Sequence, residues 1–174
     1  MIKYSKKGGV YVELMGCSFT GHRSFPDKYR AKLSELLRRG IEYAYGLGCR
    51  AFYAGGALGF DTLAAREVIR FRMSHPDVSL ILILPCINQN ELWCGSDTDA
   101  YEYTLSEADE VRYIAEEYTK SCMQKRNRAL AEACDIMIAY VSRPRSGAAQ
   151  TVRMAESLGK KVYNLYASLE SGGE

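Results

Sequence analysis

The sequence predicts an α/β domain built on a mainly parallel sheet of about six strands. Short apolar segments alternate with amphipathic ones along the chain, which is typical of strands connected by helices that cover both faces of a sheet. The 174 residues contain no repeat, linker or low-complexity segment. We therefore expect a single domain over residues 1–174, with its core at about residues 10–166.

The first half of the chain predicts three strands and two helices. The expected strands cover residues 14–19, 51–54 and 78–84, and the expected helices cover residues 27–45 and 60–73. The first helix is predicted by apolar residues that recur at steps of three and four, with charges on the opposite face. These apolar residues are Tyr29, Leu33, Leu36, Leu37, Ile41 and Ala44.

The second half continues the alternation after a long loop at residues 88–96. A helix is expected to begin near Asp97 or Thr98. The remaining predicted elements are strands at residues 111–115, 135–141 and 161–165, and helices at residues 122–133 and 147–158. Residues 168–174 are expected to be a frayed tail.

Charge and cysteine content narrow the function classes. The chain has 23 basic and 21 acidic residues, and this near balance argues against a generic polyanion binder. The charge is nevertheless patterned: residues 88–117 carry a net charge of −8 and residues 122–153 one of +4. The acidic segment would repel a long polyanion, whereas the basic one could hold a small phosphate.

The cysteines, the histidines and the apolar runs of the sequence predict where the protein is located and whether it binds a metal. The six cysteines include no C-x-x-C pair, and the chain begins without a signal-peptide pattern, so we expect a reduced, cytoplasmic protein. The longest apolar run, residues 78–85, is far too short to cross a membrane. His22 and His75 lie far apart without nearby cysteines, so no metal site is expected.

Polar residues directly follow the first predicted strand. An open parallel sheet binds ligands at the carboxyl ends of its strands, at the point where the strand order reverses. The residues here are Thr20, Gly21, His22 and Arg23. Gly21 allows close backbone approach, and Arg23 offers a planar fork for phosphate or carboxylate. The alternative is a plain turn with a surface arginine.

A glycine-rich turn follows the second strand and leads directly into a helix. It contains Gly55, Gly56 and Gly59, with Asp61 just after them. Exposed N–H groups at a helix N-terminus favour phosphate binding, although the spacing matches neither the dinucleotide fingerprint nor a P-loop. The alternative is a tight turn in which Asp61 caps the helix.

Three further segments could contact a ligand. Arg126 lies in a basic cluster at the start of a helix, where a nearby anion or simple solvent exposure would explain it. Ser146, Gly147 and Thr151 begin the next helix and form a second candidate phosphate cradle, flanked by arginines. Trp93, in the long loop, could stack on a base or anchor the loop to the core.

Four of these segments, taken in order, resemble the YspA/YpsA-like family of the SLOG superfamily, over roughly residues 10–166. They are the turn at Thr20, the turn at Gly55, the cluster around Arg126 and the helix start at Ser146. The resemblance implies a Rossmann-like three-layer sandwich related to the DNA-processing protein DprA and to the LOG phosphoribohydrolases. It also implies ligands such as nucleoside phosphates, ADP-ribose or NAD metabolites. The ligand-facing residues that it implies are Gly21, Arg23, Gly55, Gly56, Asp61, Ser146, Gly147 and Thr151.

The chain departs from the LOG pattern P-G-G-x-G-T-x-x-E after the corresponding strand. If Gly147 aligns with the second glycine, Arg153 stands at the position of the glutamate. The carboxylate that would perform acid/base work is then missing, so no catalytic residue is assigned and enzymatic activity stays open.

The leading interpretation is a domain that binds a nucleotide-derived ligand as a sensor or regulator. One alternative is a nucleotide phosphoribohydrolase or other N-glycosidase, with Asp61 or Glu67 as the nearby carboxylate. A second alternative is DprA-like binding of single-stranded DNA, against which the near-neutral charge counts. No cofactor is assigned beyond such a nucleotide, no membrane partner is expected, and a homo-oligomer stays open.

Overall fold

Six parallel strands form one sheet in the order β6-β5-β4-β3-β7-β8, which confirms the predicted fold class. The computed structural model describes residues 4–7, 10–13 and 15–171. The strands of this sheet are β3 (Met15–Gly21), β4 (Cys49–Ala54), β5 (Ser79–Cys86), β6 (Glu110–Ala115), β7 (Ile136–Tyr140) and β8 (Lys161–Asn164). The strand order reverses between β3 and β7, so that is where this fold is expected to bind ligands.

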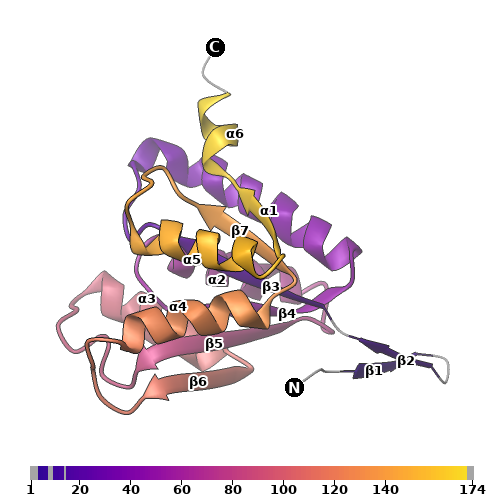
Figure 1. Ribbon diagram of the computed structural model, residues 1–174, viewed down its shortest axis with the longest axis horizontal. Coiled ribbons are helices and arrows are strands. Elements are labelled where there is room, and N and C mark those ends of the chain that lie inside the picture. The colour runs from indigo at the N-terminus through magenta and orange to yellow at the C-terminus, as the bar shows by residue number, and fades with distance from the viewer. Residues whose placement is uncertain (1–3, 8–9, 14, 172–174) are drawn as a thin grey trace.

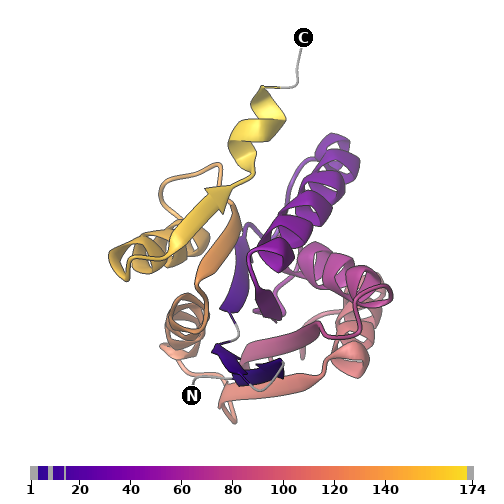
Figure 2. The ribbon, with the colours of Figure 1, turned by 90° about the vertical axis from the view of Figure 1, so that its right-hand side faces the viewer.

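Helices cover both faces of the sheet, as Figures 1 and 2 show. They are α1 (Arg30–Gly46, after the short 3-10 helix η1, Asp27–Tyr29), α2 (Phe60–Arg72), α3 (Ser96–Glu107), α4 (Cys122–Ala133), α5 (Gly147–Ser157) and α6 (Tyr166–Glu170). Right-handed crossovers place α1, α2 and α3 on one face, since the chain first moves from β3 toward β6. It then returns in the opposite direction, which places α4 and α5 on the other face.

A separate antiparallel hairpin precedes the sheet. It consists of β1 (Tyr4–Lys7) and β2 (Val10–Glu13), and it forms its own two-stranded sheet. The sequence patterns did not predict it. The predicted first strand of the main sheet begins at residue 14, which lies outside the described residues, and β3 is described from Met15.

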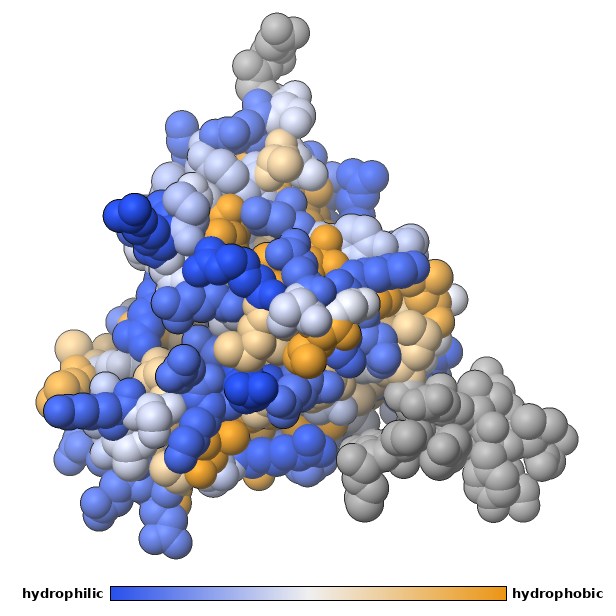
Figure 3. Space-filling model, viewed as in Figure 1, coloured by the Kyte–Doolittle hydropathy of each residue, from blue (hydrophilic) through white to orange (hydrophobic). Residues whose placement is uncertain are grey.

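The largest core lies between the sheet and the face covered by α1 and α2. Leu33 and Leu37 of α1 pack there with Phe19 and Phe52 of the central strands, and all four are fully buried. The central strands are buried on both faces, which explains their continuous apolar sequences. Hydrophilic residues predominate on the outer surface over α4 and α5 (Figure 3).

The structure differs from the sequence-based prediction at the end of one strand and in the carboxyl-terminal tail. Strand β5 continues through Pro85 to Cys86. Proline has no N–H to donate to a neighbouring strand, and β4 ends opposite Leu82, so no ladder hydrogen bond to β4 is lost at Pro85. The expected frayed tail is wrong from residue 168 to 170: α6 continues there, and Leu169 is buried in the main core. Residues 172–174 lie outside the described part of the chain.

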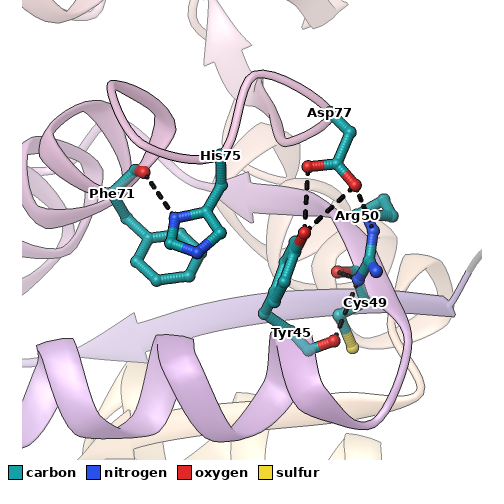
Figure 4. Close-up of polar contacts among 6 residues, drawn as sticks. All are labelled: Tyr45, Cys49, Arg50, Phe71, His75 and Asp77. Carbon is teal, nitrogen blue, oxygen red and sulfur yellow. Dashed lines mark hydrogen bonds and ion pairs between the residues drawn. The ribbon is translucent and has the colours of Figure 1, made fainter.

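A polar cluster closes the amino-terminal edge of the sheet (Figure 4). The Arg50 guanidinium lies 3.8 Å from the centre of the Tyr45 ring and donates to Asp77 Oδ2 over 2.8 Å. Tyr45 Oη also donates to the Asp77 carboxylate, while His75 stacks on Phe71 and bonds to its carbonyl. These contacts join the end of α1 to the start of β5, at the edge opposite the predicted ligand site.

Among the residues that the structure describes, no helix combines the length and the apolar character needed to cross a membrane.

We expect Leu37→Ala to lower the free energy of unfolding by about 2–5 kcal/mol, because it leaves a cavity where α1 packs on the sheet. Leu47→Ala is the matched control: Leu47 ends the same helix with its side chain exposed, so its change should stay within about 0.5 kcal/mol. Urea denaturation measures both. Equal losses would contradict this description of the core.

Candidate functional site

A cavity of about 410 Å³ opens at the carboxyl edge of the sheet, next to the turns that follow β3 and β7. It lies among the turns after β3 and β4 and the starts of α4 and α5. The starts of α4 and α5 lie at the left in Figure 1. Eight of the twelve residues predicted from the sequence line it. They are Thr20, Gly21, His22, Arg23, Asp61, Arg126, Ser146 and Gly147.

The other four predicted residues do not line this cavity. Gly55 contacts Arg126, and Gly59 lies against the backbone of Arg23. Gly56 packs against Leu84. The buried Thr151 hydroxyl donates to the Gly147 carbonyl over 2.9 Å within α5. The structure therefore separates residues that line the cavity from residues that shape it.

Arg126 projects from α4 beneath the glycine-rich turn and is buried. Its Nη1 donates to the Gly55 carbonyl over 2.5 Å and lies 3.5 Å from Asp61 Oδ2. Its Nε is also buried and has no hydrogen-bond partner among the described residues. Burial lowers the pKa of Arg126, and the Asp61 carboxylate opposes this shift. A guanidinium remains charged in proteins, so Arg126 brings a partly unsatisfied cation to the cavity.

Asp61, in the first turn of α2, is the carboxylate opposite Arg126. Burial raises the pKa of Asp61 to about 6, although the Arg126 guanidinium and the Ala57 N–H favour the ionised form. The Ala57 N–H donates to Asp61 Oδ2 over 3.4 Å. At neutral pH the two side chains therefore form a buried ion pair. Asp61 therefore accepts its hydrogen bond from the turn before the helix. The N-cap residue of the helix is Gly59, which has no side chain that could cap it.

The glycine-rich turn is built around this pair. A Cβ on Gly55 would overlap Arg126 Nη1, so only glycine admits the arginine at this position. Gly56 and Gly59 have φ values of +65° and +77°, which side-chain-bearing residues rarely adopt. The turn thus has a clear structural role, and direct phosphate binding by its N–H groups stays a prediction.

His22 joins three turns of the site. Its Nε2 accepts a hydrogen bond from the Ser142 N–H over 2.9 Å, and its carbonyl accepts one from the Phe60 N–H. Burial, reinforced by Arg143, lowers the pKa of His22. The imidazole is therefore neutral, with its proton on Nδ1. The neighbouring Gly21 is also constrained, because a Cβ there would come within 2.5 Å of the Phe60 ring.

The start of α5 contributes a cluster of backbone donors. The Ser146 side chain caps the helix by accepting from the Ala149 N–H over 3.1 Å. The first N–H groups of a helix have no acceptor within it, so those of Gly147 and Ala148 can serve a ligand in the cavity that both residues line. Arg143 lines the same cavity from the preceding loop.

Sequence reasoning missed part of the α4 wall. Met123 and Leu130 line the cavity together with Arg126 and the neighbouring Asn127. Their spacing of three and four residues places them on one face of the helix, and this period could have identified them.

The two carboxylates considered for catalysis occupy different environments. Asp61 is the only acidic residue of the described chain that lines the cavity. Glu67 is buried on α2 and forms ion pairs with Arg38, at 3.6 Å, and Arg70, at 3.1 Å. Arg153, at the position of the LOG glutamate, donates to the Pro144 carbonyl and holds the loop before α5.

A second cavity, of about 400 Å³, adjoins the first. Both are lined by Arg23, Ala57 and Met123. Trp93 lines the second cavity and also packs against the core, with its ring edge-on to Tyr101 at 5.3 Å. Anchoring and ligand contact, the two roles considered for this tryptophan, are therefore compatible.

The family assignment agrees with this geometry. The model of the YspA SLOG family matches residues 18–166, from β3 to α6. The chain belongs to the YspA SLOG family. The four turns that carried the resemblance are thus part of a match that covers most of the chain.

Curated relatives of this YspA SLOG protein are found in bacilli. The prophage-derived protein YoqJ of Bacillus subtilis is 26% identical over 154 residues, covering 80% of this chain and 86% of that protein. A UPF0398 protein of Bacillus thuringiensis is 25% identical over 140 residues, covering 79% of this chain and 72% of that protein.

Two solved structures of DNA-processing protein A (DprA) share the fold. The Streptococcus pneumoniae protein superposes with a TM-score of 0.64 at 17% identity, over 92% of this chain and 58% of that one. The Helicobacter pylori protein gives a TM-score of 0.60 at 20% identity, over 85% and 63%. The YspA SLOG chain thus spans about three fifths of these DprA chains.

We expect Gly55→Ala to destabilise the protein by about 1–3 kcal/mol, because the added Cβ must displace the buried Arg126 side chain. Gly46→Ala is the control, since a Cβ at Gly46 meets nothing within 4 Å. Urea denaturation of both variants measures the difference. A Gly55→Ala protein as stable as the control would show that Arg126 is not packed beneath the turn.

The pH dependence of stability should reveal the buried Asp61. The native carboxyl binds its proton up to about pH 6, whereas an unfolded Asp releases it near pH 3.8. Asp61 therefore makes the free energy of unfolding fall as the pH rises between these values. Denaturation of the wild type and of Asp61→Asn at several pH values isolates this effect: the wild type should lose stability relative to the variant between about pH 4 and 6. A constant difference would contradict it.

Proposed function

We propose that this YspA SLOG protein binds a nucleotide-derived ligand, such as a nucleoside phosphate, ADP-ribose or an NAD metabolite, and acts as a sensor or regulator. The phosphate of the ligand would occupy the cavity between α4 and α5. The observation that carries the proposal is the buried guanidinium of Arg126: its side chain lines this cavity, and its Nε has no hydrogen-bond partner among the residues that the structure describes. A buried, unsatisfied charged donor is costly unless a ligand completes its bonds.

The charges around the cavity support an anionic ligand. Arg23, Arg126 and Arg143 line it, against the single carboxylate of Asp61. The N-terminus of α5 adds the N–H groups of Gly147 and Ala148 and the positive end of a helix dipole. Arginines and helix N-terminal amides together form the usual environment for phosphate in proteins.

A hydrolytic function is the second candidate, and Asp61 is the observation in its favour. A cavity-lining carboxyl with a pKa of about 6 suits general acid/base work near neutral pH. Release of free base from nucleoside monophosphates or NAD, abolished by Asp61→Asn, would establish this function. The ion pair with Arg126 and the absence of a second cavity-lining carboxylate in the described chain favour binding alone.

Single-stranded DNA is a further candidate because of the fold shared with DprA, whose Helicobacter pylori form is described as binding it. The exposed Arg23, Arg143 and Arg145 near the cavity would supply phosphate contacts. Such binding predicts an affinity that falls steeply with salt and with substitution of these arginines. An affinity for oligonucleotides that stays unchanged in all three arginine variants would contradict this candidate function.

Gly147→Asp should abolish phosphate binding without unfolding the protein. The new carboxylate would lie at the N-terminus of α5, where it favours the helix but repels an anion in the cavity. Gly147→Ala is the matched control, because its Cβ would meet only Asn127 Nδ2, at 3.8 Å. Thermal unfolding with and without inorganic phosphate, AMP or ADP-ribose measures the effect.

The expected result is ligand-induced stabilisation in the wild type and in Gly147→Ala, and none in Gly147→Asp. Equal stabilisation of all three proteins would place the phosphate elsewhere. No stabilisation of the wild type by any of these ligands would overturn the proposed function. Gly56 is a poor position for this test, because a Cβ there would overlap Leu84 and strain the turn.

A further inference from the structure

We propose that the second cavity holds the aromatic base of the nucleotide whose phosphate occupies the first. This inference rests on the proposed phosphate site and deepens it, because it identifies the second half of the ligand. The two cavities meet at Arg23, Ala57 and Met123, so one ligand can extend from one into the other. Each has a volume typical of ligand sites.

The two cavities differ in chemistry. Arg126, Arg143 and the backbone donors of α5 line only the first, whereas Trp93, Tyr118 and Leu92 line only the second. An anion suits the first lining and a flat apolar group suits the second. A nucleotide combines both groups in one molecule, and an inorganic anion or a sugar phosphate does not.

Some of the apolar residues around the second cavity are unusually exposed. Leu92 is 95% exposed and Tyr118 is 65% exposed, and Ile87 in the loop that contains Leu92 is also exposed. Apolar side chains gathered at the mouth of a cavity indicate a binding surface. They come from two segments, the loop after β5 and the segment after β6, and both follow the carboxyl ends of their strands.

Trp93 is positioned before any ligand arrives. Its ring rests edge-on against Tyr101, which is buried, and packs on the main core while lining the cavity. Its loop is tied to the glycine-rich turn, because Gln89 Nε2 donates to the Gly56 carbonyl over 3.1 Å. A ring held in place loses little further freedom on stacking with a base.

Polar groups in the second cavity can meet the edge of a base. Asn88 Nδ2 donates to Glu91 Oε2 over 3.3 Å, and both side chains are exposed at the cavity. An amide and a carboxylate offer donors and acceptors for the ring nitrogens and exocyclic groups of a base. The lining therefore fits a heteroaromatic ring better than a purely hydrocarbon group.

Trp93 is the only tryptophan in the chain, so its fluorescence reports directly on this cavity. Titrations with AMP, GMP, CMP, UMP and ADP-ribose are compared with ribose 5-phosphate and inorganic phosphate. We expect at least one base-containing ligand to change the Trp93 emission and to bind about fivefold or more tightly than ribose 5-phosphate, as stacking on an aromatic residue would give. A short single-stranded oligonucleotide tests whether the nucleotide is free or part of a strand.

Tyr118→Ala tests the lining without disturbing the core, because this side chain is mostly exposed. It should weaken the base-containing ligands severalfold and leave inorganic phosphate and ribose 5-phosphate unchanged. Tyr103→Ala is the control, since Tyr103 is a similarly exposed tyrosine on α3 that lines neither cavity. It should change nothing. Trp93→Leu should weaken the same ligands more strongly.

The results separate this inference from the proposed function. If ribose 5-phosphate binds as tightly as every base-containing ligand and Trp93 emission stays constant, the base site is wrong and the phosphate site stands. If base-containing ligands bind normally to Tyr118→Ala and Trp93→Leu, the base lies elsewhere. If no phosphate-containing ligand binds the wild type, both proposals fail.

Discussion

The placement of Arg126 beneath the glycine-rich turn is the constraint on which the rest of the site depends. A guanidinium can be buried there only because Gly55 has no side chain, and because the Gly55 carbonyl and the Asp61 carboxylate accept its charge. This one side chain connects α4 to the turn after β4 and to the start of α2. It also leaves one donor, the buried Nε, without a partner in the described part of the chain, on a side chain that lines an open cavity.

The topology explains why that cavity lies where it does. The chain leaves β3 toward β4 on one face of the sheet and returns to β7 on the other, so the turns after β3 and β7 separate at the carboxyl edge. His22 bridges this opening through Ser142 and Phe60. The loops after β5 and β6 lie at the same edge, which places a cavity with aromatic and aliphatic residues next to one with several arginines.

The glycines and polar residues of these turns have two distinct roles in the structure. Arg23 and Gly147 are exposed and line the cavity, whereas the hydroxyl of Ser146 is engaged in capping α5. Gly21 and Gly55 instead make room for protein groups, the Phe60 ring and the Arg126 guanidinium. Both roles produce the same pattern of glycine beside polar residues. The pattern therefore predicts which turns surround the cavity, but it does not say which of their residues line it.

The sequence by itself determined the alternation of strands and helices, the parallel sheet, the family and the turns that gather around the cavity. These features depend on local hydrophobic period and short motifs, which are readable along the chain. Only the tertiary structure decided that Arg126 meets Asp61, that α6 buries Leu169, and that Trp93 lines a second cavity next to the one that Arg126 lines. The physical reason is that such pairs depend on close packing between distant segments, where a single Cβ decides which side chain fits.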